Sequence, residues 1–231
     1  MAAFLESIGY NGWVLPVLLI IPVIGALLVW LHGATLRGAT GDALVAAEHT
    51  ARVVTLATFL VEFVVSAGLW WSFDASSAGW QASFDAAWIN AWGARFTLGI
   101  DGLSLMMVLL TTFLMPLAVL GGWTSVNKKV HSYHMLMLLL TVGMLGVFVA
   151  RDLFLFYVMW EVMLVPMYFI VGIWGGERRL YASLKFFIYT MFGSLLMLVA
   201  IVYLGYQAGL TAGQPNFSYD AILALNELDP A

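Results

Sequence analysis

The amino-acid sequence predicts an all-α membrane protein with six transmembrane helices. Its composition is far more apolar than that of a soluble domain, and its apolar residues form long runs without charge. Of 231 residues, 63% are hydrophobic and 10% charged, and the mean hydropathy is +0.96, whereas a soluble domain is about half apolar and about a quarter charged. A transmembrane β-barrel is excluded, because its strands alternate apolar and polar residues over segments of about ten.

Six runs are long enough to cross the roughly 30 Å hydrocarbon core of a bilayer, which takes about 20 apolar residues in a helix. The first has no basic segment before it, so it is interpreted as a span rather than a cleaved signal peptide. The connection over 72–99 carries tryptophans that suit a membrane interface, so we expect it to cover one end of the bundle. The predicted spans are 13–31, 53–71, 100–122, 133–150, 153–173 and 181–205.

The spans divide the chain into three parts. Residues 1–94 contain two helices and the long external loop, and 95–205 contain helices three to six. The tail over 206–231 is expected to break at Gly213 and Pro215 and to form a short surface helix over 217–226.

Positive charges divide unequally between the two sides of the predicted bundle. Six lie in the first, third and fifth connections, against Arg95 and Arg151 on the opposite side. Loops rich in Lys and Arg face the cytoplasm. We therefore expect a multi-pass protein of the cell inner (plasma) membrane, with its N-terminus and its tail outside, in the periplasm. The cations expected on the cytoplasmic side are Arg37 and Arg52, Lys128 and Lys129, and Arg178 and Arg179.

Several kinds of chemistry are excluded by what the sequence lacks. It has no cysteine, and hence no thiolate-bound cluster, disulfide or reactive thiol. It also has no dinucleotide-binding glycine fingerprint, P-loop or HExxH motif. We therefore expect no cofactor, metal or nucleic acid bound to this chain, and any redox chemistry must take place in a partner.

Glu161 is the strongest candidate for function, because an ionisable residue inside a span is costly and marks a functional site by default. It lies eight residues into its span, roughly 12 Å inside, and helical spacing aligns it with Tyr157 and Tyr168. Pro166 lacks the N–H that would bind the carbonyl of Val162, one residue from the carboxylate. A carboxyl balanced between desolvation and a nearby cation can exchange protons near neutral pH. The alternative is a structural hydrogen bond to a neighbouring helix.

Lys185 is the second candidate proton-relay residue. It lies about five residues into the sixth span and shares a helical face with Tyr181 and Tyr189 that continues toward Ser194. At this depth a lysine can also extend to the lipid headgroups, which is the competing interpretation. Because the fifth and sixth spans run antiparallel, Glu161 and Lys185 should differ in depth by about 10–12 Å, a separation that suits a water-bridged relay.

Three weaker candidates complete the predicted site. Glu62 lies among apolar residues near the middle of the second span. It is either protonated and hydrogen-bonded between helices, or it faces a subunit contact. His131 and His134 lie at the cytoplasmic end of the fourth span, where a histidine can load protons, although interfacial histidines are usually solvated.

Three charges near helix ends have ordinary structural interpretations. Asp101 lies at the head of the third span and is expected to cap its N-terminus. Arg151 and Asp152 form the whole hinge between the fourth and fifth spans, where we expect an interfacial ion pair.

These motifs resemble the antiporter-like subunits of respiratory complex I, the NADH-quinone oxidoreductase. The segment 99–105, Gly-Ile-Asp-Gly-Leu-Ser-Leu, is similar to the opening of the family's third helix. The run over 152–168 is similar to its fifth helix, and 172–190 to the connection into its sixth. The resemblance is strong over 95–205, whereas over 1–94 it is one of topology and general pattern.

The resemblance implies a proton-translocating subunit that lies between similar subunits in the membrane arm, with flavin and iron–sulfur clusters in partner subunits. The family's fifth-helix glutamate, matched here by Glu161, is a proton-relay group whose partner lysine lies on a seventh helix. The family fold has fourteen helices in two inverted repeats, so we expect these six helices to be its first part and the chain to be truncated. Two alternatives stay open: a membrane subunit of a multi-subunit cation/proton antiporter or membrane-bound hydrogenase, and a structural fragment without transport activity.

Overall fold

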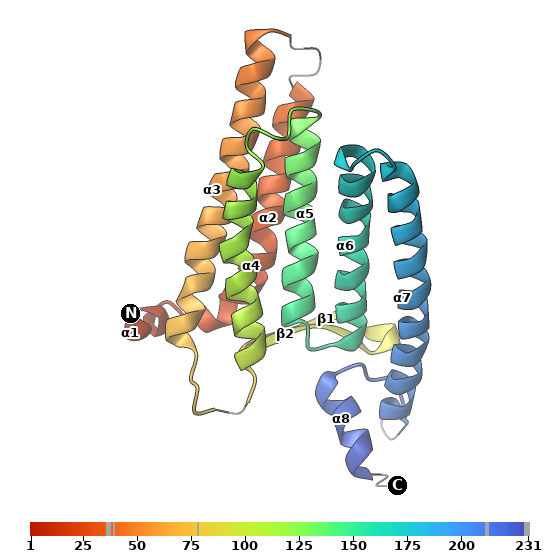
Figure 1. The fold of residues 1–231 in the computed structure, drawn as a ribbon. Helices are drawn as coiled ribbons and strands as arrows, with labels where there is room; N and C mark the ends of the chain where they lie inside the picture. Colours follow the sequence, from red (N-terminus) through yellow and green to blue (C-terminus); the bar gives the residue numbers. More distant parts are fainter. Residues whose placement is uncertain (36–37, 39, 78, 211–212, 229–231) are drawn as a thin grey trace.

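The structure, a computed structural model, describes residues 1–231 apart from 36, 37, 39, 78, 211, 212 and 229–231. Within the described residues, six helices are long and apolar enough to cross a membrane, which confirms the predicted number of spans. Helices α2 to α5 form one cluster, and α6 and α7 stand as a pair beside α5 (Figure 1). The six are α2 (Tyr10–Thr35), α3 (Asp42–Ser72), α4 (Gly102–Gly121), α5 (Val130–Val149), α6 (Leu153–Trp174) and α7 (Arg179–Gly209).

Helix α3 departs most from its predicted span, because it begins at Asp42 rather than at 53. The added segment is rich in alanine, the strongest helix former, so the helix continues past the apolar run. The prediction that Arg52 lies in a loop is therefore wrong. Arg52 lies within α3, and its Nη2 donates to the carbonyl of Val126 at 2.9 Å, beside the α4–α5 connection. Arg37 lies outside the described residues.

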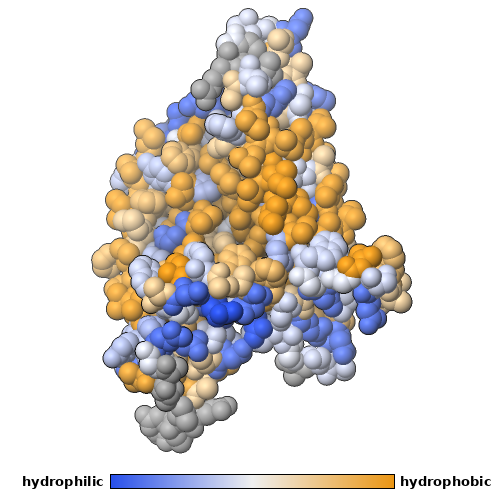
Figure 2. Space-filling model, turned by 180° about the vertical axis from the view of Figure 1, so that it is seen from behind, coloured by the Kyte–Doolittle hydropathy of each residue, from blue (hydrophilic) through white to orange (hydrophobic). Residues whose placement is uncertain are grey.

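The short helices α1 (Ala2–Ser7) and α8 (Tyr219–Leu228) lie at the same end of the bundle (Figure 1). Helix α8 matches the surface helix predicted over 217–226. Apolar side chains form a broad band across the middle of the molecule, and hydrophilic side chains gather toward its ends (Figure 2). A bundle that spans a bilayer exposes such a band to lipid.

The loop predicted over 72–99 contains an antiparallel β-hairpin, which the sequence prediction missed. Strand β1 (Gln81–Ile89) pairs with β2 (Ala94–Ile100) through a 3₁₀ turn, η1 (Asn90–Trp92). Gly93 closes the turn with a φ of +69°, a left-handed conformation that glycine adopts at little cost. The signal is present in the sequence, because apolar and polar residues alternate over 81–86 of β1 and along β2.

The hairpin runs across the end of the bundle beneath α5 and α6, so it covers that end as expected (Figure 1). Its tip packs near α7, where Ala94 and Ile201 share a small apolar cluster with Phe217. Its second strand also bridges to the α5–α6 hinge, because Leu98 pairs with Ala150.

Close packing holds the spanning helices together. Lipid tails are as apolar as leucine, so helices in a membrane associate through tight contacts at small residues rather than through escape from water. A Cβ added at Gly25 of α2 would lie 2.6 Å from the side chain of Thr58 on α3. Gly143 and Gly146 of α5 admit the side chains of Met163 and Met159 of α6 in the same way. These contacts fix the rotation of α6, and with it the direction of its polar face.

Candidate functional site

Helix α6 carries Glu161 near its middle. Asp152 starts the helix as its N-cap, with its Oδ1 accepting the backbone N–H groups of Phe154 at 2.9 Å and Leu155 at 3.0 Å. Glu161 is half-buried, and its Oε1 is buried without a hydrogen-bond partner among the described residues. Pro166 is buried one turn further on, where its missing N–H would otherwise bind the carbonyl of Val162.

The polar face of α6 turns toward α7. Ser183 of α7 packs against Gly172, and the ring of Phe187 packs at a tilt against that of Tyr168, with ring centroids 5.3 Å apart. Tyr157 lies close to both Glu161 and Ser194 of α7.

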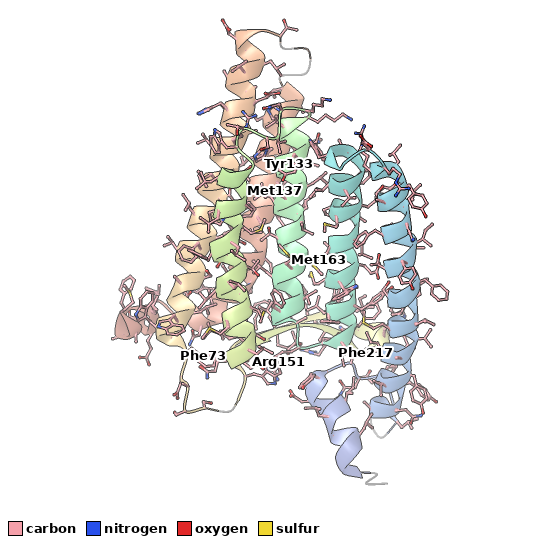
Figure 3. All side chains as sticks on the ribbon, viewed as in Figure 1. Phe73, Tyr133, Met137, Arg151, Met163 and Phe217 are labelled. Carbon is pink, nitrogen blue, oxygen red and sulfur yellow. The ribbon has the colours of Figure 1, made fainter. Side chains whose placement is uncertain are left out.

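Glu161 lies between these contacts along α6, and helical spacing places it on the same face. Its carboxyl therefore faces the stretch of α7 between Phe187 and Ser194. The opposite side of α6 packs on α5, where Met163 lies between the two helices (Figure 3).

Lys185 lies on the other side of α7. It follows Ser183 by two residues, about 200° around the helix, and its side chain is exposed. Its Nζ lies 5.8 Å from the ring centroid of Tyr181, in a groove of about 670 Å³ that Tyr189 also lines. The expectation that this face continues to Ser194 is wrong, because Ser194 is buried on the side that faces α6.

The structure does not bring Lys185 to Glu161. By the register between α6 and α7, Lys185 is level with Ile170, nine residues or about 13 Å along the helix from Glu161. The separation in depth is close to that expected from the sequence, but the two side chains point in different directions. Within the described residues, the polar side chain that lies close to Glu161 is therefore that of Tyr157 rather than that of Lys185.

Glu62 lies apart from this site, inside the cluster of α2 to α5. Its side chain is 0% exposed, and neither carboxyl oxygen has a hydrogen-bond partner among the residues that the structure describes. Its burial agrees with a position between helices, the first of the two interpretations left open by the sequence, but the hydrogen bond that this interpretation expects is not made among the described residues.

The histidines gather at the opposite end of the bundle from the hairpin. The rings of His131 and His32 lie 5.8 Å apart, and His131 also lines a pocket of about 340 Å³. His134 is 2% exposed, so it is buried rather than solvated. Its Nδ1 lies 2.9 Å from the carbonyl of Val130, and since a carbonyl only accepts, that nitrogen carries the hydrogen. The four histidines at this end are His32, His49, His131 and His134.

The acidic residues near the hairpin act at helix starts. Asp101 caps α4 as predicted, with its Oδ1 accepting the N–H of Ser104 at 2.7 Å, and this bond lowers the pKa of Asp101. Asp152 is 2% exposed; burial raises the pKa of its carboxyl, against the hydrogen bonds from Leu155, Arg95 and Phe154 that lower it.

The expected ion pair at the α5–α6 hinge has a different acidic partner. Arg151 pairs with Asp220 of α8 at 2.6 Å, and its guanidinium stacks over the ring of Trp80 at 4.9 Å. Asp152 uses its carboxylate as a helix cap instead. Arg151 and Phe217 both lie at the hairpin end of the molecule (Figure 3).

The matched family places this site in a known type of membrane subunit. A family model described as "NADH:quinone oxidoreductase/Mrp antiporter, TM" matches residues 150–223, which include α6 and α7. NADH-quinone oxidoreductase subunit M of Rhodobacter capsulatus is 46% identical over 175 residues, 76% of this chain and 34% of the relative. Subunit M of Escherichia coli (strain K12) is 39% identical over 220 residues, 90% of this chain and 41% of the relative. The chain belongs to the family of antiporter-like membrane subunits shared by NADH-quinone oxidoreductase and Mrp antiporters.

A solved structure shares the antiporter-like fold. A chain of "Respiratory complex I from Thermus thermophilus with bound NADH" matches with a TM-score of 0.69 and 28% identity, over 91% of this chain and 39% of that chain. The chain thus spans between 34% and 41% of the length of these three relatives. Six helices of the antiporter-like fold are present here, and Glu161 lies within the segment that the family model matches.

Two polar contacts of this antiporter-like chain were missed by the sequence prediction. Ser194 recurs at helical spacing from Ser183 and Phe187, a pattern that marks the face of α7 toward α6. Ser66 lies four residues after Glu62 and meets Thr112 of α4 at 2.7 Å. Both signals are weak in a sequence, because single hydroxyl residues are common in membrane helices.

Proposed function

We propose that this chain is part of a proton-translocating membrane-arm subunit of NADH-quinone oxidoreductase. Electron transfer occurs in partner subunits that hold flavin and iron–sulfur clusters, and this chain moves protons through side chains alone. The observation that carries the proposal is the buried Oε1 of Glu161, which has no hydrogen-bond partner among the described residues and lies in a transmembrane helix of the matched family segment.

Glu161 acts as a proton-relay carboxyl. In its neutral form it donates a hydrogen bond, and in its ionised form it accepts one. Tyr157 lies close to Glu161 and to Ser194, which supports a hydroxyl route between the carboxyl and α7. The carbonyl of Val162, deprived of a donor by Pro166, offers a further acceptor one residue away.

Lys185 serves this function from a distance. Its exposed ammonium group and the neighbouring Arg178 line the same groove, at the end of α7 that carries the α6–α7 connection. We infer that these charges set the potential at the mouth of the relay, and that the cationic partner in direct contact with Glu161 comes from another helix. His131 and His134 act at the same end of the bundle as proton-loading groups.

The setting is a multi-pass protein of the cell inner membrane, with its N-terminus and hairpin in the periplasm. The outer face of α7 exposes large apolar side chains such as Leu196 and Val199. This face suits contact with lipid or with neighbouring antiporter-like subunits.

The test is replacement of Glu161 in the assembled complex. Glu161→Gln keeps the size of the side chain and removes its titratable proton, so NADH-driven proton translocation into vesicles should fall by roughly tenfold or more. Glu161→Asp should retain part of the activity. Glu6→Gln, at an exposed glutamate on α1, is the matched control and should leave translocation unchanged. Normal translocation by Glu161→Gln in a normally assembled complex would contradict the proposal.

A cation/proton antiporter is the second candidate, because the matched family model covers Mrp antiporters as well as NADH:quinone oxidoreductase. Both candidate functions place Glu161 in the same relay, so the Glu161→Gln substitution does not distinguish an oxidoreductase subunit from an antiporter subunit. Purification of the complex does: flavin and iron–sulfur subunits with NADH oxidation support the oxidoreductase. A complex without them that exchanges sodium for protons supports the antiporter.

A further inference from the structure

A second carboxyl lies in a part of the bundle that the relay at Glu161 does not use. Glu62 is near the middle of α3, and α3 packs mainly on α2, α4 and α5. Its side chain is 0% exposed, with both oxygens unpartnered among the described residues. An ionised carboxylate in such a place is strongly disfavoured, so the neutral acid is the form that fits.

The helices around Glu62 offer it no opposite charge. Helix α4 has no ionisable side chain. On α2 the ionisable residues lie at the two ends, and on α5 they lie within the first five positions. On α3 the nearest charge is Arg52, ten residues or about 15 Å away along the helix. The titratable or charged groups of these four helices other than Glu62 are Tyr10, His32, Asp42, Glu48, His49, Arg52, His131, Tyr133 and His134.

A pair of hydroxyl groups lies one turn from Glu62. Ser66 is four residues further along the same buried face of α3, and its Oγ lies 2.7 Å from Thr112 Oγ1 on α4. Ser66 also contacts the carbonyl of Phe63 at 2.9 Å, and Thr112 that of Val108 at 3.0 Å. The two hydroxyls bring only two hydrogens to these bonds but have four lone pairs, so the pair can accept a hydrogen bond from an acid.

Helix α4 adds a main-chain acceptor at the same level. Pro116 is buried four residues after Thr112 and has no N–H to donate to the carbonyl of that residue. The hydroxyl and the main-chain carbonyl of Thr112 therefore can each accept a further hydrogen bond, and both lie beside Ser66. A neutral carboxylic acid at Glu62 supplies the kind of donor that this arrangement lacks.

We propose that Glu62 is a second intramembrane proton-binding site, a neutral acid that donates to the Ser66–Thr112 hydroxyl pair between α3 and α4 when its side chain turns toward that pair. In the structure neither carboxyl oxygen makes this bond. The site lies outside the Glu161 relay, and proton binding by Glu62 does not depend on that relay being correct. Hydroxyl groups that both accept and donate allow the proton to leave along the pair and another to replace it.

The first experiment labels the wild-type complex in its membrane with dicyclohexylcarbodiimide. This apolar reagent reacts with a protonated carboxyl: the acid O–H adds across one C=N bond, the oxygen bonds to carbon and the proton to nitrogen. Rearrangement to the N-acylurea leaves the whole reagent attached, without a leaving group. We expect peptide mass spectrometry to find the adduct on Glu62 and a water-soluble carbodiimide to leave Glu62 unlabelled while labelling exposed Glu177. No adduct at Glu62 with the apolar reagent, or equal labelling by both, overturns the proposal.

The second experiment measures the hydrogen bond by infrared spectroscopy of the same complex. Glu62→Gln should remove one carboxylic C=O band, and that band should shift when the membrane is placed in D₂O. Ser66→Ala and Thr112→Val should each move the band to higher frequency, because each removes part of the acceptor pair. Ser183→Ala, at a buried serine on α7, is the matched control and should leave the band in place. A band that Ser66→Ala and Thr112→Val do not move, or that does not respond to D₂O, refutes the proposed site. In the labelling experiment, an adduct on Glu161 is counted separately and does not bear on the site at Glu62.

Discussion

At the scale of single residues, Asp152 connects two separate parts of the chain. Its carboxylate accepts two N–H groups at the start of α6 through Oδ1, at 2.9 and 3.0 Å, and the N–H of Arg95 from β2 through Oδ2 at 3.1 Å. The side chain is 2% exposed. Removal of this carboxylate would leave N–H groups unsatisfied both in α6 and in β2.

Replacement of Asp152 should therefore cost more than the loss of an ordinary helix cap. Asp152→Ala removes the cap and leaves one buried and two part-buried N–H groups without this acceptor, so we expect a loss of about 2–4 kcal/mol in unfolding free energy. Asp152→Asn keeps one oxygen for α6 but turns an amide N–H toward Arg95, so it should lose about 1 kcal/mol. Thermal unfolding in detergent, followed by tryptophan fluorescence, measures the order of stability of wild type, Asp152→Asn and Asp152→Ala. Equal stability of wild type and Asp152→Ala would show that the cap carries no weight.

At the scale of elements, the hairpin, the α5–α6 hinge and α8 are joined by backbone as well as side-chain bonds. Arg151 donates its N–H to the carbonyl of Thr97 in β2 at 2.9 Å, and its own carbonyl accepts the N–H of Tyr219 in α8 at 2.9 Å. Its guanidinium adds the bond to Asp220 and the contact with Trp80. Gly99 has no side chain and so leaves room for Arg151, because a Cβ added at Gly99 would clash with the Arg151 side chain.

The two arginines at this end should differ in how much they stabilise α8. Arg95 pairs with Asp85 on the surface, with side chains 50% and 48% exposed, whereas the Arg151 side chain is 18% exposed. Exposed pairs contribute little because solvent screens them. Arg151→Ala should therefore raise hydrogen–deuterium exchange in α8, and Arg95→Ala should leave α8 exchange unchanged. The prediction fails if both variants exchange alike in that helix.

The same elements show how far the sequence determines the fold. The length of an apolar run predicts a span without reference to other helices, so all six spans were predictable. The alternation in β1 and β2 was short and was overlooked, although it predicts strands. The partner of Arg151 was not predictable, because Asp220 lies 69 residues away and meets it only when α7 returns the chain to the hairpin end.

The candidate site was predictable in part. Glu161 stands out in any reading of α6, since a charge within an apolar span has few ordinary explanations. The spacing of Lys185 from Tyr181 and Tyr189 shows that the three residues share one face of the helix. It does not show whether that face contacts α6 or points outward. Packing of Ser183 and Phe187 against α6 decides it, and turns Lys185 outward.

At the scale of the whole molecule, the two ends of the bundle differ in charge. Five described cations lie at the end that holds the α2–α3, α4–α5 and α6–α7 connections: Arg52, Lys128, Lys129, Arg178 and Arg179. The hairpin end holds Arg95 and Arg151, each paired with an aspartate. Pairing removes much of the positive field at the hairpin end, so the asymmetry in unpaired charge is greater than the residue count indicates.

This asymmetry predicts the orientation of the protein in the membrane, with the hairpin end outside. The chain has no cysteine, so a single introduced thiol reports the side on which it lies. Ser77→Cys, in the exposed turn before β1, should react with a membrane-impermeant maleimide in intact cells. Gly176→Cys, in the α6–α7 connection with no atom within 4 Å of its added Cβ, should react only after the membrane is opened. The reverse pattern would place the five unpaired cations outside and would also reverse the side from which protons reach the histidines and Lys185.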